Sequence, residues 1–308
     1  MDKKPTIPTL AYSIAKPMKA DFKIKNFNSK QFPLIVVGMH RSGTSVLARC
    51  LESMGVFSGR LLDENHEPLF FANLNNWLIR QCGTEWDWPL QAEVVQNNPD
   101  FVKWSVERLN SLIRSPRSWA YLGLKNTIKF RSIPNLQIPW GWKDPRNLIT
   151  LPIWSKVFPN ARVVLVTRHG VDVAESLRVR AQKMIDCATA TQFDWLRIRP
   201  QSATNSIRCL NIQEGLQLWH EYNQIGGRTI HASGLPYICI KFEDLMAEPS
   251  QTLRSLAAFA NLSPTEATIT GISKNLRLER AFGYLAKPSL VAFAEHNYDL
   301  LKFGKYQP

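Results

Sequence analysis

The chain has 308 residues, of which 44% are hydrophobic and 20% are charged, a balance typical of globular rather than disordered proteins. No apolar run approaches the ~18–20 residues of a membrane-spanning helix. The five cysteines include no Cys-x-x-Cys pair, which argues against a disulfide framework or a zinc site. Lysine and arginine number 38 and aspartate and glutamate 25, so the formal net charge is +13. This surplus indicates an anionic ligand but leaves nucleic acid, a membrane surface and a phosphorylated small molecule open.

The N-terminal segment 1–30 contains seven lysines against two aspartates, and three prolines break any periodicity in it. This composition predicts a flexible basic arm, with a solvated tail of no specific role as the alternative. The lysines also interrupt any apolar stretch that would serve as a secretory signal, so the sequence predicts a cytoplasmic protein. We expect the remainder, 31–308, to form one domain.

That domain opens with an apolar, β-branched run at 32–38, which predicts a strand buried on both faces. Apolar residues between Val46 and Met54 then recur with helical spacing. Two further amphipathic helices are predicted over 68–82 and 99–115.

A second buried strand is predicted at 162–167, and a helical pattern follows it between Val171 and Ala181. A third strand is predicted at 236–241, with a helix near 250–260 after it. Strands that alternate with helices predict a three-layer α/β/α fold around a central parallel sheet. In such a fold ligands bind beyond the carboxyl ends of the strands.

The segment Gly38–Ser45 joins the first strand to its helix. Its two glycines are spaced as in the phosphate-binding loop Gly-x-x-x-x-Gly-Lys-[Ser/Thr]. Such glycines let backbone N–H groups point inward, and the positive end of the helix dipole attracts an anion. Here Thr44 replaces the lysine, Arg41 lies within the loop, and no carboxylate directly follows the strand at 162–167. A loop of this kind is poorly suited to Mg²⁺-nucleotide chemistry and predicts a phosphate-bearing ligand that needs no metal.

Several segments resemble the sulfotransferases that use 3′-phosphoadenylyl sulfate (PAPS). Gly38–Ser45 resembles their 5′-phosphosulfate loop, and Arg168–Ser176 resembles the motif in which an Arg and a later Ser hold the 3′-phosphate. Trp142–Arg146 is similar to the Lys-Asp-Pro segment of the tyrosine-sulfating and related bacterial branches, and 237–262 to the family's last strand–helix unit. The likeness covers 32–262 and is closest to bacterial sulfotransferase-like proteins.

The resemblance implies a P-loop NTPase-like fold and sulfuryl transfer from PAPS to a hydroxyl or amine. The transfer would be an in-line displacement without a metal, with 3′-phosphoadenosine 5′-phosphate (PAP) as the product. Arg41 and Lys143 would contact the transferring group and the bridging oxygen. The resemblance implies these donor-binding residues: His40, Arg41, Ser42, Gly43, Thr44, Ser45, Arg168 and Ser176. Among them, we expect His40 to pack the loop rather than to take part in catalysis.

The general base must lie within about 3 Å of the acceptor's proton. Carboxylates and a histidine cluster just before the helix predicted at 68–82. Glu67 stands before Pro-Leu-Phe-Phe, which resembles the glycan N-sulfating branch, where a catalytic Glu precedes x-x-Phe-Phe. Glu67 is therefore the first candidate, with Glu64 and His66 as alternatives. Glu67 could instead be a carboxylate that only favours the start of a helix.

The acceptor itself is not identified by the sequence, and a small molecule, a glycan or a peptide all fit. Residues 178–210 carry an excess of basic side chains and predict a lid or acceptor insertion, although a plain solvated face fits equally well. Residues 271–288 show no convincing motif for contacts to the 3′-phosphate. The oligomeric state is left open.

Three other functions compete with a sulfotransferase. A kinase or NTPase is disfavoured by the missing loop lysine, and a non-catalytic PAP-binding protein by the intact Arg41, Lys143, Arg168 and Ser176. A nucleic-acid-binding protein is disfavoured because no recognised module is present and the basic residues are spread along the chain. We therefore expect no nucleic-acid partner and no transmembrane segment.

Overall fold

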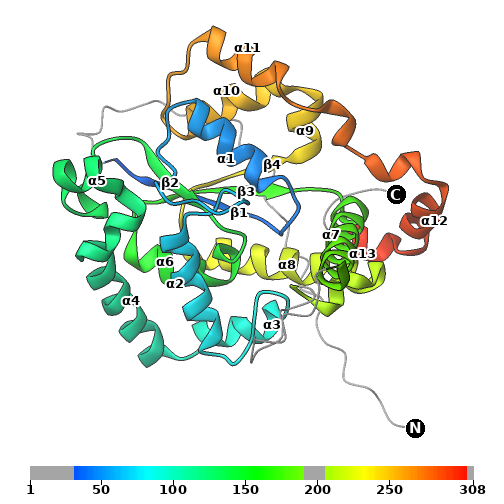
Figure 1. Ribbon diagram of the computed structural model, residues 1–308, viewed down its shortest axis with the longest axis horizontal. Coiled ribbons are helices and arrows are strands. Elements are labelled where there is room, and N and C mark those ends of the chain that lie inside the picture. Colours follow the sequence, from blue (N-terminus) through cyan, green and yellow to red (C-terminus); the bar gives the residue numbers. More distant parts are fainter. Residues whose placement is uncertain (1–30, 191–204, 304–308) are drawn as a thin grey trace. The chain divides into compact units, whose positions relative to one another are not determined.

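The computed structural model describes residues 31–190 and 205–303. Its sheet has four parallel strands in the order β2-β1-β3-β4 (Figure 1): β1 (Pro33–Val37), β2 (Trp140–Lys143), β3 (Arg162–Thr167) and β4 (Tyr237–Lys241). This arrangement confirms the predicted parallel sheet. The predicted arm at 1–30 and the middle part of the predicted lid (178–210), at 191–204, lie outside the described residues.

Helices pack on both faces of this sheet. The α-helices of the described residues are α1 (Thr44–Ser53), α2 (Leu69–Arg80), α3 (Pro89–Ala92), α4 (Pro99–Arg114), α5 (Trp119–Phe130), α6 (Asn147–Val157), α7 (Gly170–Ala190), α8 (Ile212–Ser233), α9 (Phe242–Ala247), α10 (Pro249–Phe259), α11 (Glu266–Lys274), α12 (Pro288–His296) and α13 (Tyr298–Phe303). Figure 1 shows α1, α9, α10 and α11 on one face and α2, α4, α6 and α8 on the other.

The two layers of helices enclose two hydrophobic cores, and β1 contributes to both. Alternate side chains of a strand point to opposite faces. Leu34 and Val36 accordingly join the core under α1 and α10, whereas Ile35 and Val37 join the core under α2, α6 and α8. All four are almost completely buried, as expected for a central strand covered on both faces. The three-layer α/β/α prediction is thus confirmed.

The predicted elements at 32–38, 68–82, 99–115, 162–167 and 236–241 are confirmed within one or two residues by β1, α2, α4, β3 and β4. The edge strand β2 was not predicted, because its sequence Trp-Gly-Trp-Lys lacks the β-branched run of the other strands. Its Gly141 is required by close packing, since a Cβ atom there would lie 2.3 Å from the carbonyl oxygen of Leu34. The long helix α8 was likewise not predicted.

The strand register decides which segments meet at the carboxyl edge of the sheet. Val36 of β1 is paired with Lys143 of β2, and Val37 of β1 with Leu165 of β3. Lys143, the loop that follows Val37, and Arg168 after β3 therefore emerge side by side. None of the helices within 31–190 and 205–303 has both the length and the apolar character needed to cross a bilayer.

Candidate functional site

The loop between β1 and α1 has a backbone that requires glycine at two positions. Gly38 and Gly43 have φ angles of 147° and 92°, in the region that L-residues rarely adopt. A Cβ atom on Gly38 would lie 2.3 Å from the carbonyl oxygen of Val166, and one on Gly43 would lie 2.3 Å from the ring of Phe242. Gly43 is the N-cap of α1 and supplies no side-chain cap. The first N–H groups of α1 thus remain available to an anion.

Arg41 of this loop meets Arg168 and Ser176, which lie 127 and 135 positions further along the chain. Arg41 Nε donates a hydrogen bond of 2.9 Å to Ser176 Oγ. Arg168 donates to the carbonyl oxygen of Arg41 at 3.3 Å and forms an ion pair of 3.2 Å with Asp172. All four residues line one pocket of about 1000 Å³. The structure therefore brings together the two predicted phosphate-binding motifs.

Three buried polar atoms, two in the loop between β1 and α1 and one on the pocket residue Arg168, have no hydrogen-bond partner within 31–190 and 205–303. They are Ser42 Oγ, Arg168 Nε and His40 Nε2. Buried polar groups in native proteins are nearly always satisfied, so exceptions call for an explanation such as a missing ligand. Positive charge is also concentrated here, because Arg180, Arg168 and Arg280 lie near Arg41. Burial and then these three neighbouring cations lower the pKa of Arg41. A multiply anionic ligand fits this set of donors.

His40 packs within the loop, as the sequence predicted. Its ring lies 4.3 Å from the ring of Trp86 and 6.2 Å from that of Tyr222. Burial, together with nearby cations of which Arg146 and Lys143 act most strongly, lowers the pKa of His40 well below its usual value. The imidazole is thus neutral at neutral pH and adds no charge to the loop.

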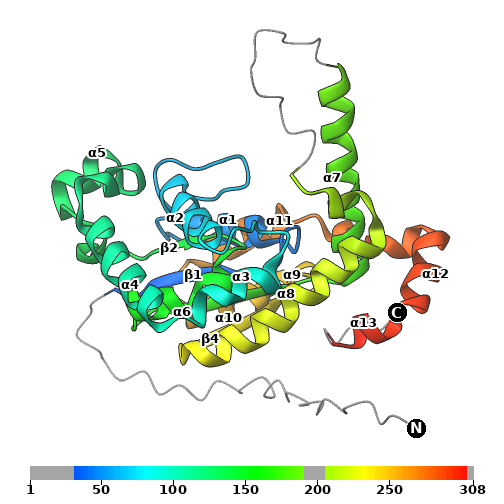
Figure 2. The same cartoon turned by 90° about the horizontal axis from the view of Figure 1, so that it is seen from below.

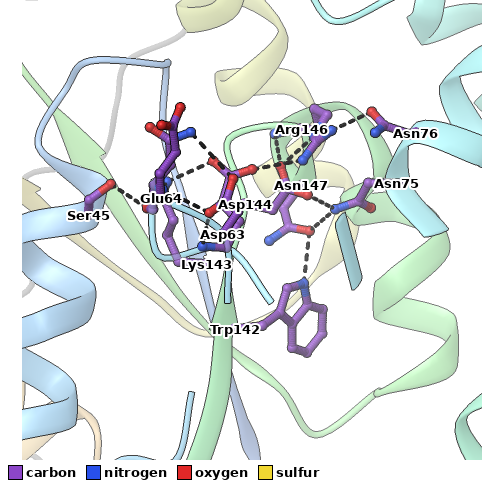
Figure 3. A network of polar contacts seen from close by, with 12 residues as sticks. Ser45, Asp63, Glu64, Asn75, Asn76, Trp142, Lys143, Asp144, Arg146 and Asn147 are labelled. Atoms are coloured by element: carbon purple, nitrogen blue, oxygen red, sulfur yellow. Dashed lines mark hydrogen bonds and ion pairs between the residues drawn. The ribbon is translucent and has the colours of Figure 1, made fainter. Parts of the chain in front are cut away.

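The other hydroxyls of the loop hold its local structure. Ser45 Oγ donates a 2.7 Å hydrogen bond to the carbonyl oxygen of Asn65, which connects α1 to the loop before α2. Thr44 is buried at the start of α1, where its methyl group lies close to Gly38. Figure 3 shows Ser45 beside the segment that carries Asp63 and Glu64.

Lys143 belongs to what we call the buried charge cluster: Glu67, Lys143, Asp144 and Arg146. Lys143 Nζ donates to Glu67 Oε1 at 2.8 Å, and Arg146 donates to Glu67 Oε2 at 2.8 Å and to Asp144 Oδ1 at 2.7 Å. The exposed fraction of each residue is 9% or less. Two cations and two anions thus neutralise one another in a space that water hardly reaches.

A set of neutral side chains holds the cluster in place (Figure 3). Asn75 donates to Asp144 Oδ2 and to Asn147 Oδ1, each at 2.8 Å. Trp142 Nε1 donates to the same Asn147 oxygen at 3.0 Å, and Trp154 Nε1 donates to Asn75 Oδ1 at 2.8 Å. Each of these four residues is almost completely buried. The carboxylates are therefore fixed by hydrogen bonds as well as by opposite charge.

The pKa values in the cluster reflect a balance between burial and charge. Burial raises the pKa of Glu67, and the nearby Asp144 carboxylate adds to the rise, while Lys143 and Arg146 oppose it. For Arg146, burial lowers the pKa, but the carboxylates of Asp144 and Glu67 outweigh that effect and the pKa is raised. Arg146 was not assigned a role from the sequence, although it lies in the segment Trp142–Arg146.

The three candidate bases lie in different environments. Glu67 is buried against Lys143, whereas the Glu64 side chain is 81% exposed, lines the pocket and pairs with Arg180 at 3.3 Å. His66 Nε2 lies 2.9 Å from the carboxylate of Glu52 on α1. The loop that carries all three is folded around Asp63, whose carboxylate accepts the backbone N–H of Glu67 at 2.7 Å.

The C-terminal part of the domain closes one side of the pocket, a contact that no sequence motif indicated. Asp172 accepts the backbone N–H groups of Gly283 and Tyr284, at 3.2 and 2.8 Å. Arg168 donates to the carbonyl oxygen of Arg280 at 2.8 Å, and the rings of His169 and Tyr284 stack at 4.3 Å. The one sequence feature that relates to this contact is the position of Asp172, one helical turn after Arg168.

Comparison with known proteins identifies the family to which the chain belongs. A model of the sulfotransferase family matches residues 33–266, which is most of the chain, so the chain belongs to the sulfotransferase family. The predicted family and the assignment as a sulfotransferase enzyme are thereby confirmed. No curated protein gives a significant match.

Several solved structures resemble the chain at low identity. A sulfotransferase domain from the Synechococcus PCC 7002 olefin synthase is 16% identical, with a TM-score of 0.45 over 96% of this chain and 100% of that chain. A sulfotransferase from Alicyclobacillus acidocaldarius is also 16% identical, with a TM-score of 0.45; the match covers 89% of this chain and 95% of that chain. A mouse sulfotransferase complexed with PAP is 12% identical, with a TM-score of 0.41; the match covers 85% of this chain and 69% of that chain.

Proposed function

We propose that this sulfotransferase uses PAPS as its donor and transfers the sulfuryl group to a hydroxyl or amine without a metal. The observation that carries the proposal is the convergence of Arg41, Arg168 and Ser176 on one pocket, next to the loop that leads into the uncapped start of α1. PAPS bears two phosphate groups and a sulfate, and it supplies the activated sulfuryl group. The unsatisfied atoms Ser42 Oγ and Arg168 Nε provide buried donors for these anionic groups.

The two ends of the pocket would bind the two phosphates. Backbone N–H groups at the start of α1, with the hydroxyls of Ser42 and Thr44, would hold the 5′-phosphate. The Ser45 hydroxyl would join them on releasing the carbonyl oxygen of Asn65. Arg168 at the end of β3 and Ser176 on α7 would hold the 3′-phosphate. An arginine is suited to this task because its planar guanidinium forms paired hydrogen bonds with phosphate oxygens. Asp172 would keep Arg168 in position through their ion pair.

Lys143 and Arg41 would stabilise the charge that develops on the transferring group and on the leaving oxygen. Fixed cations at such positions commonly supply the largest part of the rate enhancement. Lys143 is now bound to Glu67 Oε1 and to the carbonyl oxygen of Asn65, at 2.8 and 3.0 Å. It must exchange at least one of these partners to contact the donor.

This exchange would also prepare the general base. When Lys143 Nζ leaves Glu67 Oε1, that oxygen is free to accept the proton of an acceptor hydroxyl. Arg146 would meanwhile keep the second oxygen, Oε2, in place through its 2.8 Å hydrogen bond. The raised pKa of Glu67 suits a base better than the pKa of an exposed carboxylate does. Glu64, which lines the pocket, and His66 remain the alternatives.

A transfer assay tests this proposal. The purified chain is incubated with ³⁵S-labelled PAPS and separate pools of phenols, sugars, amines and tyrosine peptides. We expect label to move into at least one pool, to be lost in the Lys143→Ala variant, and to be retained when EDTA is added. If no pool is labelled and PAPS is not converted to PAP, the donor assignment is wrong. If EDTA abolishes transfer, the metal-free mechanism is wrong.

A further inference from the structure

Helix α5 exposes two large aliphatic side chains on one surface. Leu124 is 78% exposed and Ile128 is 72% exposed. Residues four apart on a helix lie on the same face, so these two side chains are neighbours. They follow Gly123, where φ is 68° and ψ is 170° and the helix is interrupted. Helix formation restarts after this break and turns the pair outward.

The exposure of this pair is not a sign of weak packing, because the rest of α5 is anchored firmly. Tyr121, Leu122 and Phe130 are buried in the core. The hydroxyl of Tyr121 donates to the carbonyl oxygens of Gly141 and Phe57, at 2.6 and 3.1 Å. The fold thus has no need of Leu124 or Ile128 for its own core.

Positive charge surrounds the exposed pair. Lys125, Lys129 and Arg131 are exposed beside it, and the side chain of Arg60 lies against Gly123. The sequence from 108 to 131 contains six basic residues and no aspartate or glutamate. Such a run is unusual in a chain with 25 acidic residues among 308. Figures 1 and 2 both place α5 beyond the edge strand β2, at the opposite end from α12.

We propose that this surface (Arg60, Leu124, Lys125, Ile128, Lys129 and Arg131) docks on an anionic membrane. Aliphatic side chains flanked by lysine and arginine are the pattern of interfacial segments, in which the apolar groups enter the acyl boundary and the cations meet anionic headgroups. A second copy of the chain would bring cations against cations. A nucleic acid would leave Leu124 and Ile128 without apolar contacts. The proposal does not depend on the identity of the donor.

Co-sedimentation of the full chain with lipid vesicles tests the proposal. We use phosphatidylcholine alone and phosphatidylcholine with phosphatidylglycerol in a 3:1 mixture, at low and high salt. We expect binding to the anionic vesicles only, weakened by salt. The double variants L124S/I128S and K125Q/K129Q should each lower the vesicle affinity about tenfold or more, because each interfacial lysine and each buried aliphatic group contributes substantially.

Two control variants separate this surface from general effects. Ile207→Ser removes an equally exposed aliphatic side chain on another segment, and Lys274→Gln removes an exposed cation on α11. Both should bind vesicles as the wild type does. Thermal melting verifies that every variant is folded.

Several results would overturn the proposal. One is absence of binding, and another is equal binding to neutral vesicles. A third is an affinity unchanged in L124S/I128S, which would assign the binding to basic residues elsewhere, such as the seven lysines of 1–30. A fourth is a wild-type dimer, detected by ultracentrifugation, that this double variant abolishes, because the surface would then join two copies.

Discussion

The pocket lined by Arg41, Arg168 and Ser176 lies at the same edge of the sheet as the buried charge cluster. The two regions differ in how well their polar groups are satisfied by hydrogen bonds. At the pocket, Arg168 Nε is buried without a partner among the described residues, and so is Ser42 Oγ in the adjoining loop between β1 and α1. In the cluster, both oxygens of Glu67 accept hydrogen bonds from cations, and Arg146 contacts two carboxylates. The pocket is thus built for an incoming anion, whereas the cluster is complete without one.

This difference indicates how the work is divided between binding and chemistry. A preformed pocket with unsatisfied donors binds a ligand without first breaking internal contacts. A neutral, buried cluster must instead give up a contact before Lys143 can act. We therefore expect substitutions in the cluster to affect stability and rate, and substitutions in the pocket to affect donor affinity. Four substitutions, in order of decreasing effect, test that separation.

Arg146→Met should have the largest effect on stability. It would leave the buried carboxylates of Asp144 and Glu67 without their shared cation, and breaking a buried ion pair commonly costs about 3–5 kcal/mol. Urea unfolding followed by circular dichroism measures the change. The control is Arg254→Met, which removes an exposed arginine paired with Glu266 and should leave the midpoint unchanged. Equal midpoints for the two variants would contradict the structural role of the cluster.

Glu67→Gln should lower turnover by about 10²–10⁴-fold, the range typical of a lost general base. Because the pKa of Glu67 is raised, wild-type turnover should fall as the pH drops through a value above the usual range of a glutamate. Below that pKa the carboxyl is protonated and cannot accept a proton. The pH profile of PAPS turnover shows this acidic limb. The Glu64→Gln variant should keep the acidic limb of the profile. If the limb disappears in that variant, the general base is Glu64.

Lys143→Ala should lower turnover by about 10²–10³-fold, as expected for loss of one preorganised donor to the transition state. Its affinity for PAP should change little, because PAP lacks the sulfuryl group that Lys143 is proposed to contact. Turnover and PAP calorimetry on the same protein sample measure both quantities. A large loss of PAP affinity with unchanged turnover would reverse the proposed roles of pocket and cluster.

Ser176→Ala should weaken PAP binding by about 3- to 10-fold, since one hydrogen bond is worth about 0.5–1.5 kcal/mol. Stability should hardly change, because the Ser176 side chain forms a single hydrogen bond among the described residues, to Arg41 Nε at the wall of the open pocket. Ser155→Ala on α6 is the matched control and should leave PAP affinity as it is. Identical PAP affinity in the two variants would remove Ser176 from the donor site.

The two regions also differ in how far the sequence predicted them. The pocket depends on short segments, each with a strand, a turn and a helix, so Gly38, Gly43 and Arg168 could be placed from local patterns. The cluster depends on contacts between distant segments. The pairing of Glu67 with Lys143 and Arg146 spans 76 and 79 positions and leaves no trace in local spacing.

The same reasoning explains what the sequence did not reveal. The strand β2 carries Lys143 to the carboxyl edge but has tryptophan and glycine in place of a β-branched run. The docking of Gly283 and Tyr284 on Asp172 uses backbone N–H groups, which any residue supplies. Contacts made by the backbone have no side-chain signature, so only the folded chain shows them.

The central claim is that the pocket binds the 3′-phosphorylated nucleotide through Arg168, and calorimetry with PAP tests it most directly. We predict clear saturable binding by the wild type, unchanged binding by the Arg254→Ala control, and loss of at least about tenfold in affinity for Arg168→Ala, because charged hydrogen bonds are worth about 1.5–3 kcal/mol. Absence of PAP binding by the wild type, or equal affinity in the Arg168→Ala variant, would contradict the account.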